Sequence, residues 1–213
     1  MLLLSVAFAV GALIGAVGIG GLLLIPALAV VTGMDMHEAM ATALFTFIFT
    51  GVAGTALFQR KGTIDWRITR PLCAGAFVFA FAGAWTNSRA TPGMLSVFLA
   101  AVIIFAGAYT LAAWRRAPHP AFEGRPTAQQ VLLSGVGALA GFGSGLTGVG
   151  GPALSVPLML LFGFPALASI GASQVIQIIA AVSGTFANLA FGSIDFALAA
   201  PVTVVEIGGV FLG

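Results

Sequence analysis

Long apolar runs, separated by short polar breaks, form the dominant pattern along the chain. A helix needs about 20 apolar residues to cross the hydrocarbon core of a bilayer. The runs that reach this length are 38–59, 68–87, 93–114 and 166–190. The other apolar runs are 2–17, 21–32, 128–146, 151–163 and 196–213. The pattern therefore predicts an all-α polytopic membrane protein.

Two of the shorter runs, 21–32 and 151–163, are far too short to span a bilayer, and each lies directly behind a cluster of glycines. Short, Gly-interrupted segments at matching positions in two halves of a chain are typical of discontinuous helices in transporters. We therefore expect Gly-interrupted re-entrant or broken helices in both halves.

The glycine clusters belong to a pattern that recurs after 130 positions. The motif GxxxGxxGxGG occurs at 11–21 and again at 141–151. Later matches at the same offset are Gly33 with Gly163, Gly62 with Gly192, Asp65 with Asp195 and Pro71 with Pro201. So many matches at one offset indicate an internal duplication. Two such halves predict a transporter whose solute site lies between them.

The duplication divides the chain into a first transmembrane repeat (1–114), a cytoplasmic linker (115–127) and a second transmembrane repeat (128–213). Adding the repeat offset to 114, where the first repeat ends, gives 244, whereas the sequence ends at Gly213. The second repeat is therefore expected to lack its last helix.

Basic residues predict how the chain is oriented. Arg60, Lys61, Arg67 and Arg70 lie in one loop, and Arg115, Arg116 and Arg125 lie in the linker. Both regions are expected on the cytoplasmic side, where Lys and Arg are enriched. The counterpart of the first loop, 190–196, contains no Lys or Arg. This difference predicts inverted repeats if 2–32 and 128–163 are hairpins that enter and leave on one side. Hairpins that cross the membrane fully would leave these loops on the same sides, so re-entrant and fully spanning hairpins both stay open.

Composition agrees with the membrane assignment. Charged residues make up 7% of the chain and hydrophobic residues 60%, and the mean hydropathy is +1.12, whereas soluble domains contain about 25% charged residues. The eight basic residues are scattered over short loops, so no nucleic-acid partner is expected. Cys73 stands alone, which excludes a disulfide framework and a thiolate metal site within the chain. We expect no metal and no cofactor.

The glycine clusters are the first candidate binding site. Helices that start near Gly21 and Gly151 would direct free N–H groups and a positive dipole end at the bilayer midplane. Such tips bind anions without a cationic side chain. The candidate ligands to an anionic solute are Gly18, Gly20, Gly21, Gly148, Gly150 and Gly151. The alternative is that the GxxxG portions only pack helices closely together.

Polar side chains inside the spans extend this candidate site. Thr42, Thr46 and Thr50 recur every four residues, and Ser173 and Gln177 share one face of their helix. We expect Thr42, Thr46, Ser173, Gln174 and Gln177 to contact the solute. The alternative for each of them is an interhelical hydrogen bond.

Glu206 is the only acidic or basic residue well inside a predicted span. A carboxylate there is costly unless it is protonated or paired, so it is a candidate for proton coupling. Alternatively, it faces a missing or partner helix. Asp65 and Asp195 are expected as helix N-caps. His37 and His119 are expected to be solvated rather than ligands.

The tandem glycine motifs, the short segments ending near Pro26 and Pro157, and the G-x-I-D-[WF] turns at 62–66 and 192–196 resemble the sulfite exporter TauE/SafE family. The resemblance covers essentially the whole chain. It implies a multi-pass permease of the bacterial inner membrane that moves sulfur-containing oxyanions, organosulfonates or related carboxylates.

The sequence thus predicts a permease that exports or imports small sulfur-containing oxyanions or organic anions, with proton coupling as one option. A passive anion channel and a non-transporting membrane subunit of a larger complex are the alternatives. No Ser/His/Asp set, paired carboxylates or His/Cys metal spacing is present, so no enzyme is expected. The expected partners are a small anionic solute and the lipid bilayer, with a homodimer or other membrane subunits left open.

Overall fold

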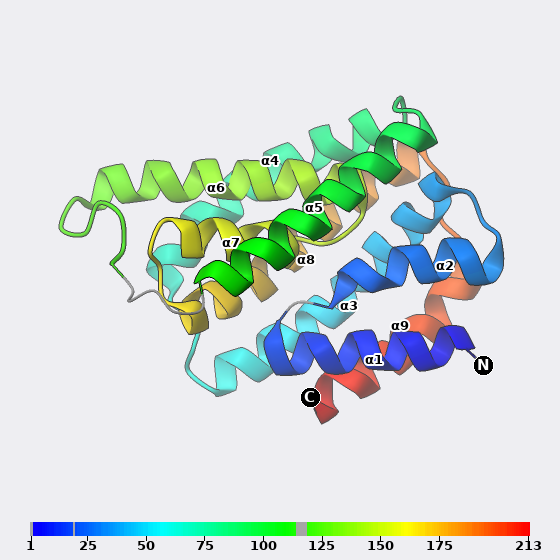
Figure 1. Ribbon diagram of the computed structural model, residues 1–213, viewed down its shortest axis with the longest axis horizontal. Helices are drawn as coiled ribbons and strands as arrows, with labels where there is room; N and C mark the ends of the chain where they lie inside the picture. The colour runs from blue at the N-terminus through cyan, green and yellow to red at the C-terminus, as the bar shows by residue number, and fades with distance from the viewer. Residues whose placement is uncertain (1, 19, 114–118) are drawn as a thin grey trace.

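The computed structural model describes residues 2–18, 20–113 and 119–213, and helices are the only regular elements among them. The first repeat contains α1 (Leu2–Val17), η1 (Gly21–Leu23), α2 (Leu24–Thr32), α3 (Met36–Arg60), α4 (Trp66–Asn87) and α5 (Pro92–Ala113). The second contains α6 (Pro126–Thr147), α7 (Pro152–Leu161), α8 (Ala166–Phe191) and α9 (Phe196–Leu212). Figure 1 shows them as one elongated bundle. The predicted all-α class is confirmed.

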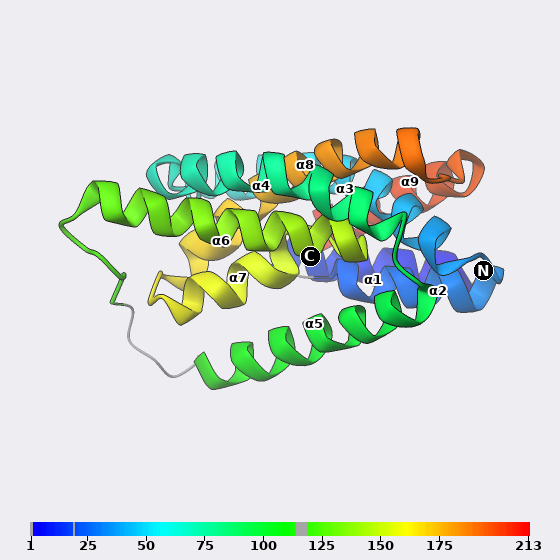
Figure 2. The same ribbon diagram turned by 90° about the horizontal axis from the view of Figure 1, so that it is seen from above.

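Five helices among the described residues are long and apolar enough to cross a membrane, namely α3, α4, α5, α6 and α8. Four of them coincide with the runs predicted as spans, and α6 extends the predicted run 128–146 to 22 residues. The apolar helices α1, α2 with η1, α7 and α9 are shorter. Figure 2 shows α5 on the outside of the bundle, where its main neighbour is α7.

Glycines bring α1 and α9 into backbone contact. A Cβ atom added to Gly11 would collide with the backbone of Glu206, and one added to Gly15 would collide with the backbone of Val210. Close approach of this kind is the usual role of small residues spaced four apart in membrane helices. The packing interpretation of this GxxxG segment therefore holds.

The second repeat makes the corresponding contacts with the first. Gly141 of α6 lies against the backbone of Ala76 of α4, and Gly145 lies against that of Ala80. Each residue in these two contacts lies 130 positions from the equivalent residue in the contacts between α1 and α9. The first helix of each repeat thus packs on a helix of the other repeat, so the two halves interlock.

The helices α3 and α8 cross where equivalent positions of the two repeats meet. The Nε2 of Gln177 donates a hydrogen bond of 3.2 Å to the carbonyl of Phe47, which lies 130 positions earlier. The colours in Figure 1 show α3 running toward the left of the view and α8 toward the right. This arrangement supports two repeats related by a local twofold axis. Their inverted orientation across a membrane stays a prediction.

Local features of the loops follow the sequence in most places. Asp65 and Asp195 are the N-caps of α4 and α9, as predicted, and their carboxylates accept hydrogen bonds from backbone N–H groups at 2.9 Å. His119 is exposed, as expected. Residues 115–118 of the predicted linker, with Arg115 and Arg116, lie outside the described residues.

The expectation that His37 is simply solvated is wrong. It is half-buried, and its Nδ1 lies 3.1 Å from Oδ1 of Asn87 at the end of α4. The Nδ2 of Asn87 donates to the carbonyl of Leu146 at 2.7 Å and contacts the sulfur of Met40. These contacts join the ends of α3, α4 and α6 just before the second glycine cluster.

Candidate functional site

Both glycine clusters interrupt a helix in the way the sequence predicts. Gly18 has φ of +77° directly after α1, and Gly148 has φ of +68° directly after α6. Side chains rarely tolerate this left-handed conformation, and glycine adopts it without strain. The chain then turns and starts a new helix, η1 at Gly21 and α7 at Pro152. Proline suits the first turn of a helix because its missing N–H has no intrahelical acceptor there.

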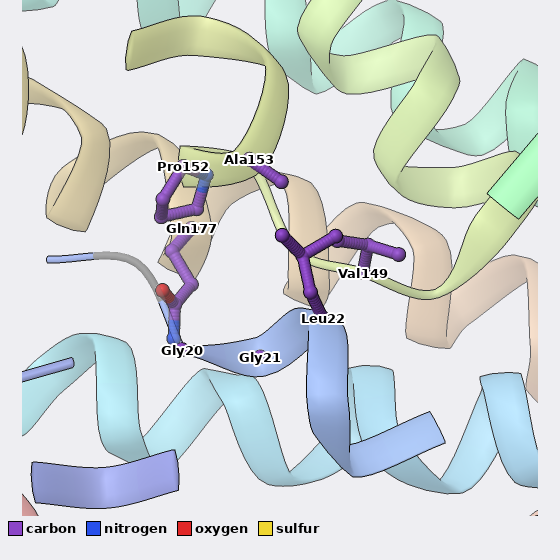
Figure 3. Close-up of a pocket in the computed structure, with 7 residues that line it drawn as sticks. All are labelled: Gly20, Gly21, Leu22, Val149, Pro152, Ala153 and Gln177. Atoms are coloured by element: carbon purple, nitrogen blue, oxygen red, sulfur yellow. The ribbon is translucent and has the colours of Figure 1, made fainter. Parts of the chain in front are cut away.

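The two interruptions meet at a small cavity in the interior (Figure 3). Its lining residues are Gly20, Gly21, Leu22, Val149, Pro152, Ala153 and Gln177. Its volume, counted as the space open to the centre of a water molecule, is about 10 Å³. This is about the minimum for one ordered water. The structure thus places the starts of η1 and α7 around one small cavity.

The polarity of the cavity comes from backbone and amide groups. None of the described residues that line it is charged. The first N–H groups of a helix lack acceptors within the helix, and the helix dipole adds a partial positive charge of about +0.5 at this end. In α7 the first intrahelical bond runs from the N–H of Ser155 to the carbonyl of Gly151 at 3.0 Å. In η1 it runs from Leu23 to Gly20 at 3.3 Å. The N–H groups that precede these bonds, those of Ala153 and Leu154 in α7 and of Gly21 and Leu22 in η1, have no acceptor within their own helices, and Pro152 has no N–H.

Gln177 is the polar side chain that reaches this cavity. Figure 3 shows its side chain extending between Pro152 and Gly20. Its Nε2 donates to the carbonyl of Phe47 at 3.2 Å and to the hydroxyl of Thr50 at 3.0 Å. Both amide hydrogens are therefore held by α3 in this conformation. A solute in the cavity would compete with α3 for these donors.

Gln174 lies one turn earlier on α8 and supports the first glycine turn. Its Nε2 donates to the carbonyl of Gly18 at 3.0 Å. Its Oε1 has no hydrogen-bond partner among the described residues, although the side chain is fully buried. This oxygen lies where a side chain at Gly54 would collide with it. Gln174 thus shapes the backbone beside the cavity without lining it.

The six predicted glycines divide into those at the cavity and those behind it. Gly20 and Gly21 line the cavity, whereas Gly150 and Gly151 connect the lining residues Val149 and Pro152. Gly18 and Gly148 form the turns one step further back and do not line it. Gly150 has φ of +81°, so a side chain there would be strained.

Besides Gln174, the other predicted polar residues that do not line the cavity are Thr42, Thr46 and Ser173. Thr42 accepts a hydrogen bond of 3.1 Å from the N–H of Asp195 and so anchors the loop before α9. The hydroxyl of Ser173 donates to the carbonyl of Ile170 in its own helix at 2.7 Å. Thr46 donates to the carbonyl of Ala43 at 2.9 Å, also in its own helix. The bond of Thr42 thus joins two separate segments, as in the interhelical alternative, whereas those of Ser173 and Thr46 stay within one helix.

Glu206 is buried in α9, on the side of the bundle that Thr46 faces. Its side chain has 0% exposure, and neither carboxyl oxygen has a hydrogen-bond partner among the described residues. The hydroxyl of Thr46 is its polar neighbour. The backbone of Glu206 is pressed against Gly11 of α1, which fixes its position between these two helices.

Several residues at the site escaped the prediction. Three of them line the cavity, namely Leu22, Val149 and Ala153. Val149 lies within the second glycine cluster, and the other two follow the clusters. Phe47 lies against Gly21 and Gly150. Phe47 lies one repeat offset, 130 positions, before Gln177. This spacing was the available sequence signal, because equivalent residues of two repeats can meet at the twofold axis that relates the repeats.

Comparison with known proteins agrees with this architecture. The family model described as "Sulfite exporter TauE/SafE" matches residues 3–213. The chain belongs to the TauE/SafE family. It is 27% identical to the probable membrane transporter protein YdhB of Bacillus subtilis (strain 168), over 100% of this chain and 88% of that protein. It is 26% identical to the probable membrane transporter protein YjnA of the same organism, over 96% of this chain and 85% of that protein.

Membership of the TauE/SafE family confirms the resemblance that the glycine motifs predicted. Together with the five helices long enough to span a bilayer, it identifies a multi-pass membrane protein of a transporter family. No solved structure matches the chain.

Proposed function

We propose that this TauE/SafE protein carries small sulfur-containing oxyanions or organic anions, such as sulfite and organosulfonates, across the bacterial inner membrane. The observation that carries the proposal is the convergence of two half-helix starts on one uncharged interior cavity. The family description supports sulfite as the first solute to test.

The chemistry of the cavity suits an anion that must be released again. Two helix N-termini supply partial positive charge. Gln177 would supply amide hydrogens to an anion once it releases its bonds to Phe47 and Thr50. No full positive charge is present among the described lining residues, so an anion would be bound without a salt bridge. Binding at such half-helix tips, between two repeats, is the arrangement that many secondary transporters use.

The small size of the cavity favours a carrier over a passive channel. Space for about one water is too little for a continuous aqueous path. A pyramidal oxyanion is larger than one water, so the tips must separate to admit it. We infer that this conformation is closed around the site and that transport requires the two repeats to move relative to each other.

Replacing Gly150 by Ala should impair transport by displacing one helix tip. The added Cβ would lie 3.2 Å from the ring of Phe47 at a φ of +81°, and left-handed backbone costs a non-glycine residue about 1–2 kcal/mol. We expect sulfite uptake into liposomes that contain the purified variant to fall at least about tenfold, which corresponds to about 1.4 kcal/mol.

The matched control is Gly62→Ala. Gly62 has φ of +68° but nothing within 4 Å of an added Cβ, so this variant carries similar backbone strain away from the cavity. It should transport sulfite at close to the unmutated rate. Equal activity of the two variants would show that the glycine tips are not the solute site.

A further inference from the structure

A line of polar side chains leads from Glu206 to the cavity. The hydroxyl of Thr46 lies beside the carboxyl group of Glu206. One turn further along α3, the hydroxyl of Thr50 contacts the carbonyl of Thr46 at 3.5 Å and accepts from Nε2 of Gln177 at 3.0 Å. Gln177 lines the cavity. Three helices thus contribute polar side chains to one line, in which the backbone carbonyl of Thr46 connects Thr46 and Thr50. All four side chains are at most 2% exposed.

The other side of the bundle has no such line. Each of these four residues has a counterpart 130 positions away in the other repeat. Ala76 corresponds to Glu206, Ile176 to Thr46, Ala180 to Thr50 and Phe47 to Gln177. All four counterparts are apolar and at most 1% exposed. The repeats provide two equivalent backbone environments, and only one of them carries polar side chains. This asymmetry is hard to explain by helix packing, because the apolar counterparts pack the same interfaces.

Among the described residues, no charged group compensates Glu206 from the helices packed around it. The main neighbours of α9 are α1 and α3. Neither α1 nor the rest of α9 contains a titratable side chain. In α3 the titratable residues are His37 and Glu38 in the first turn and Arg60 at the last position, whereas Thr46 lies in the middle of the helix. An ionised Glu206 would therefore be buried without a partner, which is strongly unfavourable in a membrane.

We propose that Glu206 is a proton-binding site and that Thr46, Thr50 and Gln177 couple its protonation to anion binding in the cavity. The inference rests on the function proposed above. The carboxyl group takes up a proton from water on one side of the membrane and releases it to water on the other side. With a monovalent anion, one proton per transport cycle makes the movement of the pair electrically neutral.

The hydrogen bonds indicate how the coupling works. The hydrogen of the Thr46 hydroxyl is donated to the carbonyl of Ala43, so this hydroxyl can accept a hydrogen bond from a protonated Glu206. When Glu206 loses its proton, it requires a donor, and the Thr46 hydroxyl is the neighbour that can turn toward it. That rotation would free the carbonyl of Ala43, one turn of α3 before the Phe47 carbonyl that holds the amide of Gln177. Proton and anion thereby influence each other through α3.

The test uses purified protein in liposomes with sulfite as the solute. Two rates are measured for each variant: sulfite counterflow without a pH gradient, and net sulfite flux with and without an imposed gradient. Glu206→Gln keeps the shape of a protonated carboxyl group but cannot exchange a proton. It should retain counterflow and lose the stimulation by the gradient. Thr46→Val should reduce that stimulation severalfold.

The matched control is Thr203→Val on α9. Thr203 is also buried, and its hydroxyl donates to the carbonyl of Ala199 in its own helix at 2.8 Å. This variant loses a hydroxyl one turn from Glu206 but outside the polar line, and its gradient stimulation should equal that of the unmutated protein. If Thr46→Val and Thr203→Val behave alike, the route through Thr46 is wrong.

The two proposals fail in different ways. If the unmutated protein shows no sulfite counterflow, sulfite is not its solute and the proposed function fails for sulfite. If counterflow occurs but the gradient has no effect, or Glu206→Gln retains the full effect, proton coupling through Glu206 is wrong.

Infrared spectroscopy provides a readout besides transport. The carbonyl band of a protonated carboxylic acid should be present in the unmutated protein, change on sulfite addition and disappear in Glu206→Gln, and its absence would overturn the assignment.

Discussion

Gln177 gives the cavity a polar side that the duplicated fold alone does not provide. Its counterpart in the first repeat is Phe47, and the two residues meet at the crossing of α3 and α8. The phenyl ring fills the space beside Gly21 and Gly150, whereas the amide lines the cavity while it donates to Phe47 and Thr50 of α3. This residue difference between the repeats places an amide on one side of the crossing and a phenyl ring on the other.

Replacing Gln177 by Leu should weaken anion binding. Hydrogen bonds to charged groups contribute about 1.5–3 kcal/mol, so the Kd for sulfite, measured by isothermal titration calorimetry in detergent, should rise about 10- to 100-fold. The control is Ser183→Ala on the same helix. It also removes a buried hydrogen bond, of 2.6 Å to the carbonyl of Phe77, and should leave the Kd unchanged. An unchanged Kd in Gln177→Leu would mean that this amide does not contact the solute.

The glycines of the repeated motif have different roles within one element. In α6, Gly141 and Gly145 allow backbone contact with α4, and Gly148 ends the helix with a left-handed conformation. The first kind of glycine is required by a neighbouring helix and the second by the chain's own turn. A motif that combines both explains how an interface and a broken helix are positioned together.

Replacing Gly141 by Ala should destabilise the contact between α4 and α6. The added Cβ would lie 2.6 Å from the Cα of Ala76, and overpacking of this kind costs about 1–3 kcal/mol. The control is Gly135→Ala in the same helix, where nothing lies within 4 Å and the better helix propensity of Ala contributes up to about 1 kcal/mol. Thermal unfolding in detergent, followed by circular dichroism, should show a lower midpoint for the first variant only. A similar midpoint for both would contradict the close packing of these helices.

At the scale of the whole molecule, features that depend on local sequence were predictable. The four long spans, the two short segments behind the glycines and the N-caps at Asp65 and Asp195 follow from run length, glycine conformation and side-chain chemistry. The duplication added the expectation that the glycine clusters act together, and the cavity between the starts of η1 and α7 agrees with it. The substrate stays a proposal because backbone donors distinguish poorly among small anions.

Features that depend on the rotation of one helix against another were not predictable. Thr42 shares a stripe with Thr46 but bonds to Asp195, which lies 153 residues further along the chain. His37 pairs with Asn87 across 50 residues. Spacing along α3 predicts which residues share a face, but it does not show which neighbour that face meets. That information comes only from the packed bundle.

The orientation of the repeats makes a prediction for the entire molecule. Gly62 and Gly192 occupy equivalent exposed loops, and only the first loop carries a cluster of Lys and Arg. In a Cys73→Ser background, Gly192→Cys should react with a membrane-impermeant maleimide in intact cells, whereas Gly62→Cys should react only in inside-out vesicles. The background variant without an added cysteine controls for nonspecific labelling. The antiparallel courses of α3 and α8 favour this outcome, because equivalent helices that run in opposite directions end on opposite faces of a membrane. Labelling of both positions from one face would instead require parallel repeats, and the cavity could not then be exposed alternately by equivalent movements of the two halves.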